Sequence, residues 1–141
     1  MTGGGVDGKI WDVARDDPRY AFEAYDFLCD AVEFTQRRHN RAPREADAAD
    51  ADHHVGGEDL SRGAVDLAIR EFGMLAPVVF RSWGIHTTTD IGEVVFNLIA
   101  AEMLAQSETD DRADFLDLFD LPEALARGFE IVLARPRNNP L

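Results

Sequence analysis

Apolar residues recur every three or four positions along most of this 141-residue chain, the spacing that gathers them on one face of an α-helix. The strongest example runs from Tyr20 to about Arg38, where three phenylalanines widen the apolar face. No window alternates strictly between apolar and polar residues, as a half-buried strand does. The pattern predicts an all-α protein with little or no sheet, and the segments with most strand character are Val78–Phe80 and Ile131–Leu133.

Helix start and stop signals divide the chain into about six helices. Pro18 suits a first helical turn, and Gly84 is placed to end a helix in the left-handed conformation. Thr87-Thr88-Thr89-Asp90 offers overlapping N-caps, and Asp90 and Glu93 have the spacing of a capping box. The clearest of the expected helices span 9–15, 20–38, 58–72, 74–83 and 91–104, and the same signals recur more weakly in short segments after residues 110 and 122. The 91–104 helix is apolar nearly all round, so we expect it at the centre of a compact bundle.

Acidic residues outnumber basic ones by 27 to 14, which gives the chain a net charge of −13. The excess is greatest between Ala42 and Asp59, a segment with six acidic residues and one basic residue. Mutually repelling carboxylates favour an extended, solvated segment over a packed one. We therefore expect one domain over residues 1–141. The parts expected outside its helical bundle are a flexible N-terminus (1–6), an acidic solvated loop (42–57) and a frayed C-terminus (135–141).

The composition also narrows the class of protein. Affinity for a phosphate backbone comes from lysine and arginine displacing counterions, so the negative charge argues against nucleic-acid binding. The longest apolar stretch, Val94–Ala105, is interrupted by Asn97 and Glu102 and is too short to cross a bilayer. The start of the chain has no secretory signal pattern. We therefore expect a cytoplasmic protein that binds neither nucleic acid nor membrane.

No motif for catalysis, for a metal or for a bound cofactor stands out. Cys29 is the only cysteine, so the chain forms no internal disulfide and no thiolate zinc cluster. His54 and Glu58 are four residues apart, but Gly56–Gly57 interrupts any helix between them. We expect no metal and no cofactor, and the balance favours a non-enzymatic protein. His54 is expected to bond near the start of the helix that follows it.

The segment from Trp83 to Ile99 has two interpretations. Two helices joined by a glycine-containing turn can form a helix-turn-helix DNA reader. A recognition helix needs polar or basic residues on its exposed face, whereas Asp90, Glu93 and Glu102 are the only charges in the second helix here. We therefore favour two core helices joined by a capped turn.

Three polar residues, Arg19, Asn97 and Asp120, lie in blocks otherwise suited to burial. An unpaired buried polar group costs about 1–3 kcal/mol. We therefore predict that Arg19 forms a structural pair with one of the carboxylates of the blocks suited to burial, and that Asn97 bonds a neighbouring backbone or side-chain group. Together with Trp83, Arg19 and Asn97 mark the place where a pocket is expected.

Several blocks of the sequence have the form of a family signature. They are Asp17-x-Arg19-Tyr20-x-x-Glu23-Ala24-Tyr25-x-Phe27, His54-Val55-Gly56-Gly57-Glu58-Asp59-Leu60, Trp83-Gly84-Ile85, Asp90-x-Gly92-Glu93-Val94-Val95-Phe96-Asn97-Leu98-Ile99, Asp114-Phe115 and Asp120-Leu121. Over about residues 11–125 the chain resembles the Minf_1886 family of uncharacterised bacterial proteins, of planctomycete and verrucomicrobial type. It departs from the family pattern at Asp59, where glutamate is usual, at Phe119 and Leu121, and in its longer acidic segment. The resemblance implies a single domain and brings no activity with it.

These observations give eight candidate structural or pocket residues, none of them expected to be catalytic. They are Arg19, Tyr20, Tyr25, His54, Trp83, Asp90, Asn97 and Asp120. The function expected is that of an acidic helical module that binds a protein partner or associates with itself. The alternatives are a helix-turn-helix regulator and, less favoured, an enzyme with a carboxylate and histidine site.

Overall fold

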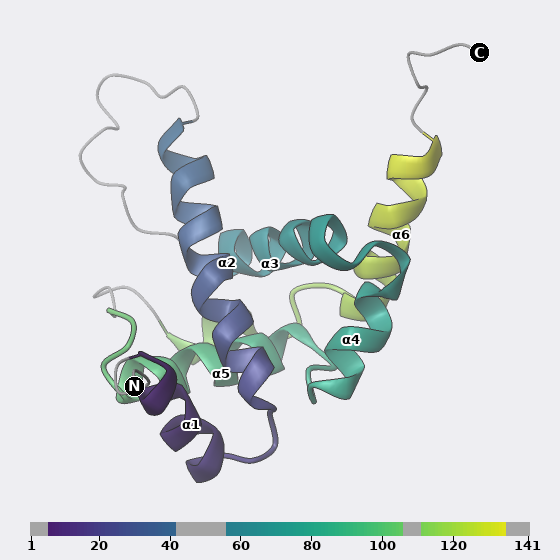
Figure 1. The fold of residues 1–141 in the computed structure, drawn as a ribbon. Helices are drawn as coiled ribbons and strands as arrows, with labels where there is room; N and C mark the ends of the chain where they lie inside the picture. The colour runs from purple at the N-terminus through teal and green to yellow at the C-terminus, as the bar shows by residue number, and fades with distance from the viewer. Residues whose placement is uncertain (1–5, 42–55, 106–110, 135–141) are drawn as a thin grey trace, which may run out of the picture.

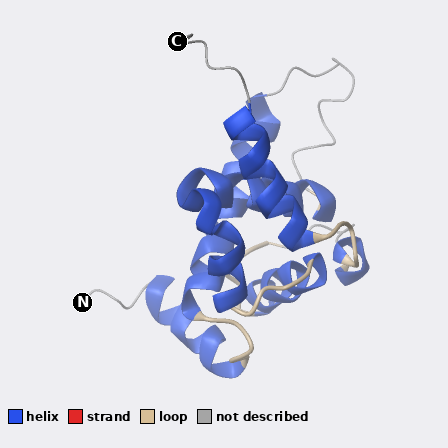
Figure 2. Ribbon diagram, turned by 90° about the vertical axis from the view of Figure 1, so that its right-hand side faces the viewer, coloured by secondary structure: helices blue, strands red, loops and turns tan. Residues whose placement is uncertain are grey.

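The structure, a computed structural model, describes residues 6–41, 56–105 and 111–134. These residues contain helices and no strand (Figure 2), which confirms the all-α class. The α-helices are α1 (Val6–Asp16), α2 (Phe22–Arg41), α3 (Gly57–Phe72), α4 (Ala76–Ser82), α5 (Thr88–Ala100) and α6 (Leu121–Ala134), and the 3₁₀ helices are η3 (Gly73–Leu75) and η4 (Arg112–Phe115). The short helix expected after residue 110 is the four-residue η4.

The segments expected to be flexible or solvated lie almost wholly outside the described residues, which exclude 1–5, 42–55 and 135–141. The two boundaries that can be compared differ slightly from the prediction. Val6 already belongs to α1, and Gly57 already belongs to α3. Pro18 lies in the turn before α2 and not in a first helical turn, because α2 begins at Phe22.

Helix α3, rather than the expected 91–104 helix, holds the central position. In Figure 1, α1, α2 and α5 lie toward one end of α3 and α4 and α6 lie toward the other. α3 packs against α2, α4, α5 and α6 and against both 3₁₀ helices, whereas α5 packs against α1, α2, α3 and η4. The buried residues of α3 are Gly57, Leu60, Ser61, Gly63, Ala64, Val65, Leu67 and Ala68.

Small residues allow α3 to take this position. A Cβ atom on Gly63 would lie 1.9 Å from Thr35 Oγ1 of α2, and one on Gly57 would lie 2.6 Å from the carbonyl oxygen of Asp114. No side chain fits at either contact, so the glycines let the backbones approach closely. Glycine and alanine add little to an apolar periodicity, and for this reason the sequence pattern ranks α3 below the leucine- and valine-rich 91–104 segment.

The end of α4 forms the glycine cap that the sequence predicts. Gly84 has a φ of +93°, and its N–H donates to the Arg81 carbonyl at 3.1 Å. The N–H of Ile85 donates to the Phe80 carbonyl at 3.0 Å, and Ile85 is buried. These two bonds and the apolar contact make a Schellman motif.

The end of α5 has the same hydrogen bonds without a glycine. Glu102 has a φ of +64°, and its N–H donates to the Ile99 carbonyl at 2.9 Å. The N–H of Met103 donates to the Leu98 carbonyl, also at 2.9 Å. As a result α5 ends four residues before the predicted position at 104.

Candidate functional site

The turn between α1 and α2 packs against the start of α5 and brings candidate residues together there. The five that meet are Arg19, Tyr20, Tyr25, Asp90 and Asn97. Trp83 fixes the turn from the α4 side, because its carbonyl accepts a hydrogen bond from the Ala21 N–H at 3.1 Å. We call these five residues, together with Asp17 and Glu93, the polar cluster.

Asp90 bonds both to its own helix and to the turn. Its Oδ2 accepts from the N–H groups of Thr87 at 3.1 Å and His86 at 2.9 Å, while Thr87 Oγ1 accepts from the Asp90 N–H at 3.2 Å. This capping box, Thr87 with Asp90, begins three residues before the predicted Asp90–Glu93 box because Thr87 is the extended residue that precedes α5. Asp90 Oδ1 then accepts from Tyr20 Oη at 2.7 Å. Burial, helped by this carboxylate, raises the pKa of Tyr20.

Arg19 forms the predicted pair with carboxylates, but at the surface. Its Nε and Nη2 donate to the two oxygens of Asp17 at 2.9 and 2.7 Å, and Nη2 also reaches Glu93 Oε1 at 3.3 Å. The Arg19 side chain is 58% exposed and that of Asp17 is 19% exposed, so the expected burial of Arg19 is wrong. Its guanidinium lies over the outer side of Tyr20, 5.0 Å from the ring centre. The hydrogen bonds from Arg19 lower the pKa of Asp17 to about 2.

Asn97 joins the same cluster from α5, about one helical turn after Glu93 and two turns after Asp90. Its Nδ2 donates to Asp17 Oδ2 at 2.8 Å and to Tyr25 Oη at 3.1 Å. Tyr25 Oη in turn donates to the Asp17 carbonyl at 3.1 Å, and burial raises the pKa of Tyr25.

The chemistry available to the polar cluster follows from these bonds. The two tyrosines stay protonated at neutral pH, because burial raises the pKa of each. The carboxylates of Asp17, Asp90 and Glu93 are held by arginine, tyrosine or backbone donors. A general base or nucleophile must be free to contact the reacting atom, whereas these carboxylates already accept hydrogen bonds from groups of the same chain. The cluster is therefore arranged to hold α1, α2 and α5 together.

Trp83 lies apart from the polar cluster in a group of aromatic rings. Its ring centre is 5.4 Å from that of Phe27, 5.7 Å from Phe72 and 5.6 Å from Phe80. The group joins α2, α3 and α4, and ring pairs at these distances add to the stability gained by burial.

Asp120 and His54 lie outside both groups. Asp120 is exposed, and its Oδ1 accepts from the Glu123 N–H at 3.0 Å. The expected burial of Asp120 is wrong, because the residue lies immediately before α6 and bonds the N–H groups of its first turn. His54 falls outside the described residues.

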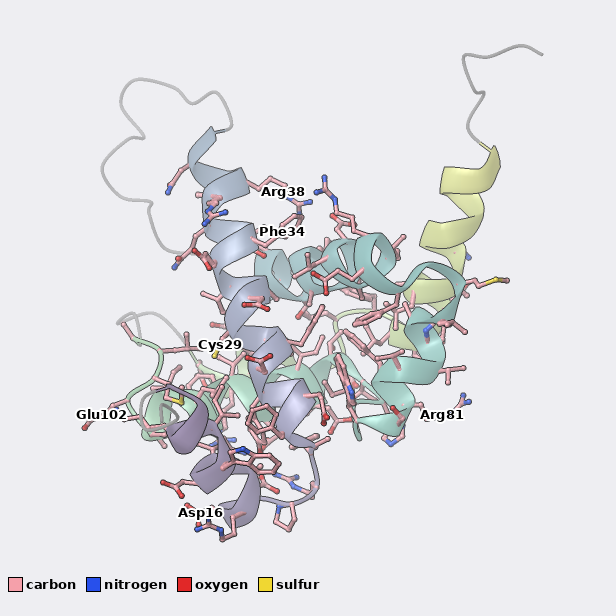
Figure 3. All side chains as sticks on the ribbon, viewed as in Figure 1. Asp16, Cys29, Phe34, Arg38, Arg81 and Glu102 are labelled. Atoms are coloured by element: carbon pink, nitrogen blue, oxygen red, sulfur yellow. The ribbon has the colours of Figure 1, made fainter. Side chains whose placement is uncertain are left out.

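A groove of about 400 Å³ lies between α2 and α3, away from the place where a pocket was expected. Its lining residues are Asp30, Glu33, Phe34, Arg37, Arg38, Leu67, Arg70 and Glu71. Phe34 and Arg38 project from α2 on the side of α3 (Figure 3). The guanidiniums of Arg38 and Arg70 lie 5.1 and 5.3 Å from the Phe34 ring centre. Charges of both signs line the groove, and Arg37 and Arg38 are paired with Glu33 and Asp66.

Three large apolar side chains are exposed together where η3 joins α4. Met74 is 68% exposed, Leu75 58% and Val78 49%. We call these three residues the apolar patch. The sequence places them in a helix but does not show which side of it faces the core, so the patch was not predicted.

The described residues offer neither a group of metal ligands nor a reactive thiol. No group of three or more histidine, cysteine, aspartate or glutamate side chains in residues 6–41, 56–105 and 111–134 could hold a metal ion. Cys29 is partly buried, and burial, together with the carboxylates of Asp26 and Asp30, raises its pKa to about 11. A thiol in this state is a poor nucleophile at neutral pH.

No described helix combines the length and apolar character needed to cross a membrane. No family model, curated protein or solved structure matches the chain.

Proposed function

We propose that the protein is a non-enzymatic module that binds another protein through the apolar patch. The observation that carries this proposal is the exposure of Met74, Leu75 and Val78, three large apolar residues close together in the sequence of η3 and α4. Removing apolar surface from water yields about 25 cal/mol per Å². Fully buried interface centres are rich in large apolar residues, methionine among them. A partner that covers the patch gains this free energy without disturbing the core.

The alternative functions have less support. Helix α5, the second helix of a helix-turn-helix interpretation, buries Ile91, Val94 and Leu98. Its two acidic residues, Asp90 and Glu93, bond groups of the same chain, so it offers no basic face to DNA. An enzyme with a carboxylate and histidine site is less favoured, because no group of three or more histidine, cysteine, aspartate or glutamate side chains among the described residues could hold a metal ion.

We also propose membership of the Minf_1886 family. The blocks that carry the resemblance supply the two sides of the polar cluster, Arg19 and Tyr20 from the first and Asp90 and Asn97 from the later one. A structure of a family member in which the corresponding residues do not meet would contradict this proposal.

Site-specific crosslinking in native lysate tests the binding proposal. A photoreactive amino acid is placed at Val78 and, as a control, at Ala126, an exposed position on α6. We expect a discrete protein adduct from position 78 that is absent from position 126 and is lost when Leu75→Ser is added. The same adduct pattern from both positions, together with a monomeric mass by light scattering, would contradict the proposal.

A further inference from the structure

The apolar patch lies in a part of the chain whose charge differs from that of the rest. The 17 consecutive residues Gly73–Thr89 contain no aspartate or glutamate, although the whole chain has 27 acidic residues among 141. Arg81 is the only lysine or arginine in this segment. Figure 3 shows Arg81 beside α4, at the outer edge of the molecule.

Arg81 also differs in its surroundings from the other arginines whose side chains the structure describes. Those that form ion pairs with carboxylates are Arg15, Arg19, Arg37, Arg38, Arg62, Arg112 and Arg127. The guanidinium of Arg70 lies over the Phe34 ring. Within the part of the chain that the structure describes, the guanidinium of Arg81 has neither an ion pair nor a ring contact. It is exposed with all its hydrogen-bond donors free for a partner.

The apolar patch and Arg81 form one continuous surface. Val78 and Arg81 are three residues apart in α4, so their side chains are neighbours on one face of the helix. Met74 lies four residues before Val78, in the 3₁₀ turn that leads into α4. Anchors at such spacings are what one helix presents to another helix that packs along it.

We infer that this surface binds an amphipathic helix of a partner protein whose apolar face is bordered by aspartate or glutamate. The inference rests on the proposed function and adds the chemistry of the partner. A carboxylate at that border would pair with Arg81, whereas a lysine or arginine there would be repelled by it. The net charge of −13 repels acidic ligands in general, and the segment Gly73–Thr89 adds no carboxylate of its own to that repulsion. The unpaired guanidinium of Arg81 is the local charge that favours an acidic border over a basic one.

A selection experiment tests the inference. A displayed library of helical peptides, with a fixed leucine face and random residues along its borders, is selected against the full-length protein and, in parallel, against Arg81→Glu. We expect aspartate and glutamate to be enriched at one border with the wild type, and lysine and arginine with Arg81→Glu. Replacing the selected acid by lysine should weaken binding to the wild type by about fivefold, the size expected for one partly exposed ion pair. Arg15→Glu, which changes the net charge equally on α1, should select the same peptides as the wild type.

The outcomes separate the inference from the function on which it rests. Peptides whose binding requires Leu75 and Val78 but shows no preference for acid would overturn the inference and leave the proposed function intact. Peptides that bind equally well after Leu75→Ser and Val78→Ser would overturn both. A dimeric mass that reverts to monomer in those same variants would assign the surface to a second copy of the chain and overturn the acidic helix.

Discussion

The polar cluster and the surface formed by η3 and α4 use their side chains differently. In the polar cluster, between the α1–α2 turn and α5, charged, amide and hydroxyl groups bond one another. On η3 and α4, the three residues of the apolar patch and Arg81 face solvent. The bonds between the α1–α2 turn and α5 join segments that lie 70 to 80 residues apart in the sequence. The apolar side chains on η3 and α4 are 49–68% exposed, so we expect substitutions there to change the stability of the fold little. The polar cluster, although it holds most of the candidate residues, therefore bonds within the fold. The apolar patch and Arg81 are the groups left exposed, and we propose that a partner binds there.

The largest effect is expected where the α4–α5 turn meets the α1–α2 turn. Gly84 has a positive φ, and a Cβ there would lie 2.2 Å from the Arg19 carbonyl oxygen. Gly84→Ala should therefore lower the free energy of unfolding by more than about 2 kcal/mol, measured by urea denaturation. Gly56→Ala is the control, because a Cβ at Gly56 meets nothing within 4 Å. Equal stability of the two variants would contradict the close contact between the Gly84 backbone and the Arg19 carbonyl.

A smaller loss is expected inside the polar cluster. Tyr20→Phe removes the donor to Asp90 Oδ1 and should lower the free energy of unfolding by about 1–2 kcal/mol. A double-mutant cycle with Asp90→Ala separates this bond from the capping role of Asp90. A coupling energy near zero would show that the hydrogen bond does not hold α5 to the turn.

The polar cluster should also give the protein a particular dependence on pH. The pKa of Asp17 is about 2 in the folded state against an ordinary value of 3.8. A lowered pKa stabilises the fold above about pH 4, and this contribution is lost as the pH falls toward 2. In Asp17→Asn the free energy of unfolding should fall less steeply between pH 4 and pH 2 than in the wild type. Arg19→Met should flatten the same range, and an unchanged slope in both variants would contradict the pairing.

The smallest effect on stability is expected at the apolar patch. Leu75→Ser and Val78→Ser should each change the free energy of unfolding by less than about 0.5 kcal/mol, because both side chains are largely exposed. Val94→Ser, at a fully buried position, should cost more than about 2 kcal/mol. A large loss at Leu75 or Val78 in thermal or urea unfolding would mean that the patch belongs to the core after all.

Much of the fold could be predicted because helix periodicity and glycine caps are local signals. The Glu58–Phe72 prediction differs from α3 by one residue, and the Gly84 cap is confirmed. The early end of α5 could not be found, since Glu102 takes a left-handed conformation without the glycine that usually marks it. The N-cap of α5 is Thr87, one of the four overlapping candidates from Thr87 to Asp90, but the capping box joins Thr87 to Asp90 and not Asp90 to Glu93. Three consecutive threonines precede Asp90, and only the extended backbone at Thr87 distinguishes them.

The candidate sites were harder to predict, for a different physical reason. The sequence singles out Arg19 and Asn97 as polar residues in apolar blocks, but their shared partner Asp17 is 80 residues from Asn97. Such a pairing depends on how the helices pack. The exposure of Met74 and Leu75 has the same origin, because periodicity shows that a face exists without showing which neighbour covers it.

The partly buried Cys29 thiol, whose pKa is raised to about 11, has a practical consequence for experiments on this protein. Its thiol should react slowly with alkylating reagents while α2 stays packed, because only the thiolate reacts readily. Opening of α2 would bring the pKa back toward its ordinary value and speed the reaction. The rate at which the Cys29 sulfur is alkylated therefore reports how often α2 opens locally, with no engineered probe required.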